Sequence, residues 1–107
     1  MKEKERIYLS IQRVLFGVLE EERLYMLRGK TVTEYINGNF QRINRQSLEL
    51  FVQGATFVAV FFPEDEYNIK KIGKCYSLSK EGKIVPYDNF FNLRNTKQKE
   101  EFLEFIG

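Results

Sequence analysis

Two hydrophobic periods follow one another at the start of the chain. The first is an alternation with a period of two residues, typical of a strand, and it covers Ile7, Leu9 and Ile11. The second has the three- and four-residue intervals of a helix, and it covers Ile11, Val14, Leu15, Val18 and Leu19. Ser10 is a suitable helix N-cap, and Gly29 is a suitable residue just beyond a last turn. The pattern predicts a short strand and then one long helix that ends near Gly29.

Short strands dominate the pattern that follows. Alternation and β-branched residues predict a strand over residues 31–35, and Asn37-Gly38-Asn39 predicts a tight turn after it. The apolar run over residues 56–62 predicts a central strand that is buried on both faces. A short helix is expected from Ser47 to Gly54, and a last helix is expected from Thr96. Further strands are expected over residues 69–78, 84–87 and 90–93.

This order of elements indicates an α+β fold. Five or six strands that do not alternate regularly with helices argue against a doubly wound parallel sheet. We therefore expect a small mixed or antiparallel β-barrel, with a long N-terminal helix and a short C-terminal helix. The 107 residues are the length of one domain, 1–107, and a hydrophobic content of 43% excludes intrinsic disorder.

Several kinds of catalytic chemistry lack their usual residues. The chain has no histidine and one cysteine, Cys75, so histidine-based triads and cysteine-rich zinc sites are not available. Cys75 fits a packed strand residue, with a reactive thiol as the alternative, and a reducing compartment such as the cytoplasm. Gly29-Lys30-Thr31 lacks the first glycine that a phosphate-binding loop has five residues earlier. We expect a protein that is not an enzyme, with no cofactor, no metal and no membrane segment.

Charges of opposite sign are separated along the chain, although the net charge is only +2. Residues 28–45 and 69–83 are basic, whereas the acidic residues gather in three other clusters. Such separation creates a basic face if the two segments adjoin, and ordinary solvated surfaces are the alternative. The candidate phosphate-binding residues are Arg28, Lys30, Arg42, Arg45, Lys70, Lys71 and Lys74. The candidate base-stacking residues are Tyr35, Tyr67 and Tyr76, for which packing in the core is the alternative.

The opening third of the chain resembles the ASCH branch of the PUA-like superfamily, small β-barrels that mostly bind RNA. Residues 8–11 are similar to its first strand, residues 12–27 take the place of its helix, and residues 29–34 are similar to its turn and following strand. The ASCH signature is Gly-x-Lys-x-x-Glu-x-Arg, whereas here Lys30 directly follows Gly29 and no arginine follows Glu34 at the expected place. In overall size the chain also resembles PrgU-type regulators encoded on enterococcal conjugative plasmids. These resemblances imply RNA binding without the residues of the hydrolase members.

Three hypotheses follow. The first is a non-catalytic RNA-binding regulator that acts on plasmid conjugation transcripts. The second is a protein-interaction module or a homodimer, for which the candidate exposed patches are Phe61-Phe62, Phe90-Phe91 and Phe102 with Phe105. The third is a small nucleotide or nucleic-acid hydrolase that uses Lys30 and Glu34.

Overall fold

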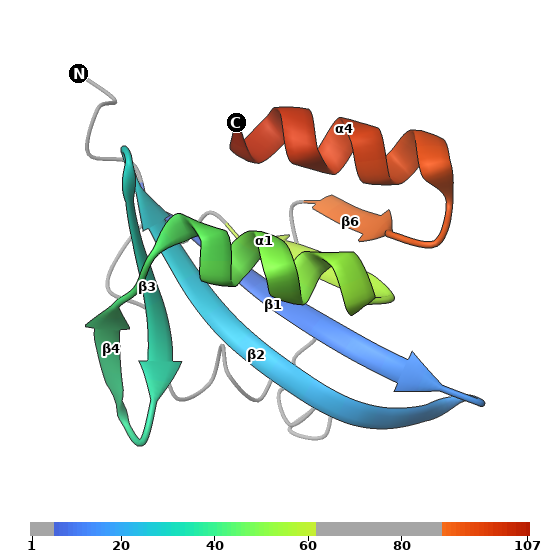
Figure 1. Ribbon diagram of the computed structural model, residues 1–107, viewed down its shortest axis with the longest axis horizontal. Coiled ribbons are helices and arrows are strands. Elements are labelled where there is room, and N and C mark those ends of the chain that lie inside the picture. The colour runs from blue at the N-terminus through green and yellow to red at the C-terminus, as the bar shows by residue number, and fades with distance from the viewer. Residues whose placement is uncertain (1–5, 62–88) are drawn as a thin grey trace.

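One antiparallel sheet and two helices make up the described part of the protein, in a computed structural model that describes residues 6–61 and 89–107 (Figure 1). The elements are β1 (Arg6–Leu15), β2 (Val18–Arg28), β3 (Thr31–Ile36), β4 (Asn39–Arg42), α1 (Arg45–Gly54), β5 (Phe57–Phe61), β6 (Asn89–Asn92) and α4 (Thr96–Ile106). The strand order is β4-β3-β2-β1-β5-β6. The α+β class is therefore confirmed, with antiparallel pairing throughout the described strands.

The prediction of a long N-terminal helix is wrong, because residues 6–28 form a β-hairpin instead. β1 and β2 pair from Arg6 with Arg28 to Leu15 with Val18, and Phe16 and Gly17 make the turn between them. Both turn residues have positive φ, 52° and 77°, as the two-residue hairpin turn requires. The register shifts between Arg13 and Val14, and this irregularity breaks the period of two that would have shown the strand. Gly17 is therefore a turn residue and not a weak point inside a helix.

The sheet is strongly curved, but it does not close into the predicted barrel. β4 and β6 are the two ends of the strand order, and no pairing joins them within residues 6–61 and 89–107. The rings of Tyr8 on β1 and Phe40 on β4 are nevertheless 5.9 Å apart. On a flat sheet the two strands would stand about 14 Å apart, because β2 and β3 lie between them. The sheet must therefore bend toward the face that carries these two rings.

Two clusters of apolar side chains cover the two faces of the sheet. We call one face the helix face, because α1 and α4 pack on it; it carries Leu9, Ile11, Tyr25, Leu27, Val32, Val58 and Val60. The other, which we call the second face, carries Tyr8, Leu24, Ala59 and Phe61, with Met26, Tyr35 and Phe40 packed beside them. β5 is buried on both faces, as its apolar run predicts.

Several shorter elements match their predictions closely. β3 and the turn at Asn37 and Gly38 are confirmed, with φ values of 50° and 89° at the turn. α1, β6 and α4 also lie where the pattern places them, but the N-caps are Asn44 and Asn95 in place of Ser47 and Thr96. The predicted strands over residues 69–78 and 84–87 lie outside the described residues. Within the described part of the chain, neither helix has the length and apolar character needed to cross a membrane.

Candidate nucleic-acid interface

Three of the predicted phosphate-binding residues meet at one end of the sheet. β2 ends at Arg28, β3 begins at Thr31 after the turn that holds Lys30, and β4 ends at Arg42. Arg28 pairs with Thr31, and Arg42 pairs with Thr33, so both arginines belong to the second face. All three cationic side chains belong to exposed residues, and none has an ion pair among the residues that the structure describes. The fold thus gathers cations that lie up to fourteen positions apart in the sequence.

A fourth cation at this end, Arg6, was missed by the sequence analysis. Arg6 lies directly opposite Arg28 in the antiparallel pair of β1 and β2. Like charges directly opposite each other on adjacent strands are unfavourable by several tenths of a kcal/mol. The mixed charges of the first six residues hide Arg6 in the sequence, and only the strand register shows its neighbour. We call Arg6, Arg28, Lys30 and Arg42 the basic end.

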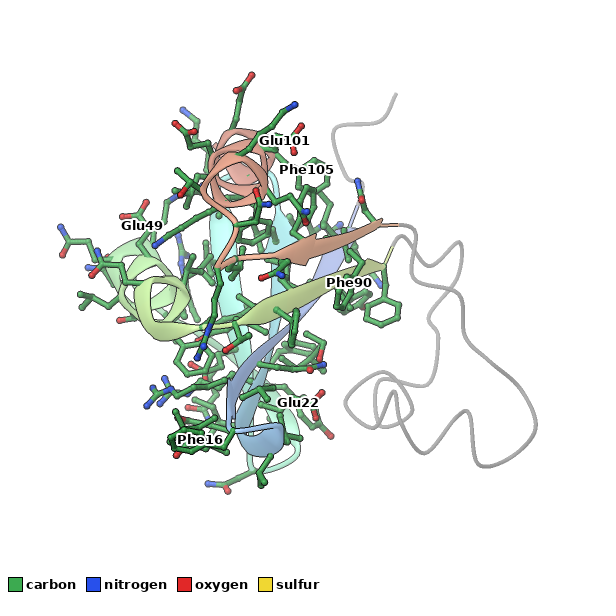
Figure 2. The ribbon with its side chains drawn as sticks, turned by 90° about the vertical axis from the view of Figure 1, so that its right-hand side faces the viewer. Phe16, Glu22, Glu49, Phe90, Glu101 and Phe105 are labelled. Atoms are coloured by element: carbon green, nitrogen blue, oxygen red, sulfur yellow. The ribbon has the colours of Figure 1, made fainter. Side chains whose placement is uncertain are left out.

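The described acidic residues lie elsewhere. Glu20, Glu21 and Glu22 follow the β1–β2 turn, in the half of the hairpin away from the basic end, and Figure 2 shows Glu22 and Phe16 toward the same end of the molecule. Glu34 belongs to the helix face, since it pairs with Tyr25. The remaining glutamates are on the helices, at Glu49, Glu100, Glu101 and Glu104. Within residues 6–61 and 89–107, the separation of signs along the sequence therefore becomes a separation in space.

Arg45 is not brought to the basic end. Its Nη2 donates a hydrogen bond to the carbonyl oxygen of Ile106, and its Nε lies 3.6 Å from Oε2 of Glu49. These contacts tie the first turn of α1 to the last turn of α4. Arg45 therefore joins the two helices on the other side of the sheet.

Aromatic side chains lie next to the basic end on the second face. Tyr35 packs against Phe40 with ring centroids 5.2 Å apart, and Phe40 in turn packs against Tyr8. Phe40 and Arg42 are two residues apart on β4, so they belong to the same face. Tyr35 and Phe40 are half-buried, whereas Tyr8 is fully buried. The other predicted residues, Lys70, Lys71, Lys74, Tyr67 and Tyr76, lie outside the described residues.

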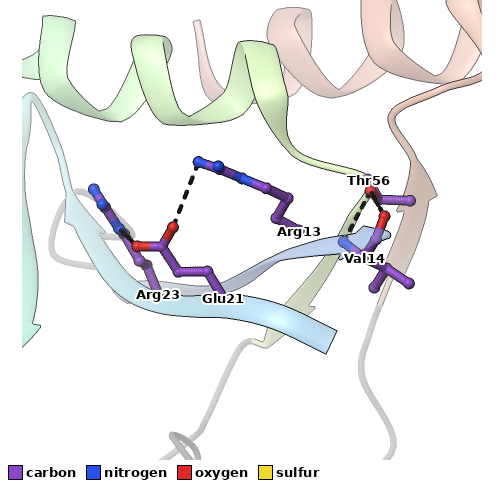
Figure 3. Close-up of polar contacts among 5 residues, drawn as sticks. All are labelled: Arg13, Val14, Glu21, Arg23 and Thr56. Carbon is purple, nitrogen blue, oxygen red and sulfur yellow. Dashed lines mark hydrogen bonds and ion pairs between the residues drawn. The ribbon is translucent and has the colours of Figure 1, made fainter. Parts of the chain in front are cut away.

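A second group of charged side chains lies on the helix face under α1 (Figure 3). The carboxylate of Glu21 bridges two arginines, with Oε2 2.7 Å from Nε of Arg23 and Oε1 3.4 Å from Nη2 of Arg13. The guanidinium of Arg23 lies over the ring of Phe51 on α1, 4.3 Å from its centroid, as in a cation–π contact. That Arg13, Glu21 and Arg23 share one face of the sheet follows only once these residues are placed on two paired strands. This group holds the hairpin to α1.

Tyr25 and Glu34 lie beside this group, and both carry raised pKa values. Burial raises the pKa of Tyr25 to about 12; the charge of Glu34 adds to this, and Arg23 opposes it. Burial also raises the pKa of Glu34, with Arg23 opposing and Glu21 adding. Lys30, the residue paired with Glu34 in the hydrolase hypothesis, lies at the β2–β3 turn, about 13 Å away along an extended strand. The structure does not bring Lys30 and Glu34 together.

Replacing Tyr25 by Phe should raise the free energy of unfolding by about 1 kcal/mol at pH 7, because the buried hydroxyl has no hydrogen-bond partner among the described residues. In the native protein the raised pKa means that the folded state holds the phenolic proton more tightly than the unfolded chain. The stability that depends on this bound proton is therefore fully present below pH 10.0, and the native protein loses it as the pH rises to about 12. Urea unfolding at pH 7 and pH 11 measures both effects, with Tyr35→Phe as the control. A Tyr25→Phe protein that is less stable at pH 7, or as sensitive to alkali as the native protein, would contradict this account.

The predicted phenylalanine patches are only partly exposed. Phe61, Phe91 and Phe102 are buried, which contradicts their assignment to a surface. Phe90 and Phe105 are exposed, and Phe62 lies outside the described residues. The largest exposed apolar group among the described residues is instead at the β1–β2 turn: Leu15, Phe16, Val18 and Leu19.

Comparison with known proteins gives no match: no protein-family model fits the chain, and no curated protein or solved structure is significantly similar to it. Membership of the PUA-like superfamily therefore stays a prediction. The function has to be inferred from the arrangement of the chain's own side chains.

Proposed function

We propose that the protein is a non-catalytic RNA-binding regulator and that its basic end contacts the phosphates. One observation carries the proposal: Arg6, Arg28, Lys30 and Arg42 come from three strands and a turn to one end of the sheet, with no glutamate or aspartate among the described residues there. Four cations in one place attract a polyanion, whereas the same charges spread over the surface would not.

Unpaired RNA suits this surface better than a DNA duplex. Tyr35 and Phe40 are half-buried beside Arg42, and flat side chains next to cations receive bases that are not stacked on their neighbours. The second face is also concave, since the Tyr8 and Phe40 rings meet across two intervening strands. Tyr8, Leu24, Ala59 and Phe61 are buried, so the bases would reach this face only at Tyr35 and Phe40, with the phosphates along the basic end. The resemblance to PrgU-type regulators suggests plasmid conjugation transcripts in the cytoplasm as the target.

The salt dependence of RNA binding tests this function. Contacts to about four phosphates of a single strand give a slope of log K against log salt near −3. Affinity should then fall about 50-fold between 50 and 200 mM salt. A filter-binding assay with a single-stranded RNA, a structured RNA and a DNA duplex of equal charge measures the slope and the preference. Absence of binding to both RNAs, or binding that does not change with salt, would contradict the proposal.

A second candidate function, protein interaction, is favoured by a different observation. Leu15, Phe16, Val18 and Leu19 are all exposed around one turn, and a group of exposed apolar side chains of this kind marks a contact site. This turn and the basic end lie at opposite ends of the β1–β2 hairpin. The two functions can therefore coexist in one protein.

A further inference from the structure

Four apolar side chains are exposed together at the end of the β1–β2 hairpin, which we call the hairpin tip. Phe16 is 94% exposed and Val18 is 65% exposed, and Leu15 and Leu19 are each 43% exposed. The hairpin extends past α1, so these side chains project from the body of the protein (Figures 1 and 2). An exposed aromatic at the turn of a projecting hairpin is a large apolar surface for so small a domain.

Phe16 does not contribute to the stability of the fold. Its side chain is almost wholly exposed, and its φ of 52° lies in the left-handed region, where a bulky residue is strained. Asn or Gly is the usual residue at the first position of this type of turn. Neither packing nor turn geometry explains a phenylalanine here. A strained residue whose side chain is almost wholly exposed points to a contact with another molecule.

The charge beside the hairpin tip indicates what that molecule carries. Glu20 lies on β2 next to the tip and is exposed, whereas Glu22 lies further along the strand and accepts a hydrogen bond from the hydroxyl of Ser10. Glu21 is already bridged to Arg13 and Arg23. An apolar tip with an exposed glutamate behind it is repelled by an anionic lipid surface and is attracted to an apolar recess with a cationic rim.

Such a recess is present in this chain, between α1 and α4. It has a volume of about 410 Å³, and its apolar lining comes from Val52, Leu103 and Ile106. A cavity of about 150 Å³ already holds a benzene ring. Arg45 and Lys99 are the cations of the lining; Glu49 pairs with Arg45, whereas Lys99 has no ion pair among the described residues. We call this recess the helix groove.

We propose that the hairpin tip of one copy of this chain inserts into the helix groove of a second copy. The apolar tip would meet the apolar lining, and Glu20 would approach Lys99. Phe16 lies at the far end of the molecule from Glu101 and Phe105 on α4, so the contact forms between copies and not within one (Figure 2). Each copy then offers a tip to one neighbour and a groove to another, which is a head-to-tail interface.

The contact is small, so the association is weak. One tip in one recess lies below the size of a standard protein interface, and we expect a dissociation constant in the micromolar range. The basic end takes no part in it. Assembled copies would therefore present several basic ends to one RNA and gain affinity through multivalency. Self-association itself does not depend on the proposed RNA binding.

Two variants that each remove one half of the contact test this proposal. Phe16→Asn removes the aromatic from the tip, and Leu103→Glu places a carboxylate in the groove at an exposed helix position. Sedimentation velocity over a concentration series should show a rising mass for the native protein and a constant monomer mass for each variant alone. An equimolar mixture of the two should form a dimer and stop there, because each variant keeps the half that the other lacks. Leu50→Asn removes an exposed apolar residue of α1 that lies outside the groove lining, and this variant should associate like the native protein.

Three results would overturn the proposal. They are a native protein that stays monomeric at every concentration, a Phe16→Asn protein that associates as the native one does, and a mixture of the two variants that stays monomeric. The last result would mean that the tip and the groove are not the two halves of one contact, whereas a Leu103→Glu protein that still associates alone would indicate a symmetric contact between two tips. Thermal unfolding checks that the fold is intact, since Phe16→Asn relieves strain at φ 52° and should raise Tm by about 4 °C.

Discussion

Replacing Phe102 by Ala should lower the free energy of unfolding by about 4 kcal/mol, within the range for a fully buried phenylalanine. Phe102 is 0% exposed and is the central contact of α4 with the sheet; its ring lies 5.5 Å from that of Phe91 on β6. Phe102 and Ile106 are the only buried side chains of α4, so no other apolar side chain of this helix is placed to fill the cavity. Because small domains have about 5–15 kcal/mol of stability in total, the loss is a large fraction of it.

The matched control for this prediction is Leu103→Ala on the same helix. Leu103 is 40% exposed, so its truncation should cost less than about 1 kcal/mol. Chemical denaturation of the native protein and both variants gives the comparison. Equal losses in the two variants would mean that α4 does not pack on the sheet through Phe102.

Reversing two charges at the basic end should weaken RNA binding about 100-fold at 100 mM salt. Arg28→Glu with Arg42→Glu removes two phosphate contacts and adds two repulsive charges, which together cost about 3 kcal/mol of binding free energy. The slope of log K against log salt should fall by about half, since two of four cations remain. Both side chains are exposed at strand ends, so the fold itself should keep its stability to within about 0.5 kcal/mol.

Arg94→Glu with Lys97→Glu is the matched control for the charge reversal. Both residues are exposed, and they lie immediately before α4 and in its first turn, at a distance from the second face. The control makes the same change in net charge, so it separates a local effect from a general one. If the two double variants weaken RNA binding equally, the basic end has no special role and net charge alone explains the binding.

Strong local signals in the sequence were enough to predict about half of the described fold. The turn at Asn37 and Gly38 and the apolar run of β5 each depend on neighbouring residues, and both predictions are confirmed. The β1–β2 hairpin was not predicted, for two reasons. Phe16 is an unusual residue for its turn, and the register shift between Arg13 and Val14 gives the apolar residues a helix-like spacing. The curvature of the sheet depends on contacts between distant strands, such as Tyr8 with Phe40, which no local pattern contains.

The candidate site was predictable as a segment but not as a surface. Arg28, Lys30 and Arg42 lie in a basic stretch of sequence, and the fold does place them at one end of the sheet. Arg6 belongs to the same site only because the register of β1 with β2 places it opposite Arg28. Arg45 does not belong to it, because its side chain donates a hydrogen bond to the carbonyl of Ile106 on the helix face. Which charges share a surface thus depends on strand pairing and not on distance along the chain.

An NMR titration with a short single-stranded RNA tests the central claim most directly. Backbone amide shifts of the native protein are followed as the RNA is added at low salt. RNA binding at the basic end should give the largest shifts at Arg6, at residues 28–31 and at residues 40–43, with little change in α4. Shifts confined to the hairpin tip or to the helices, or no shifts at all, would contradict RNA binding at the basic end.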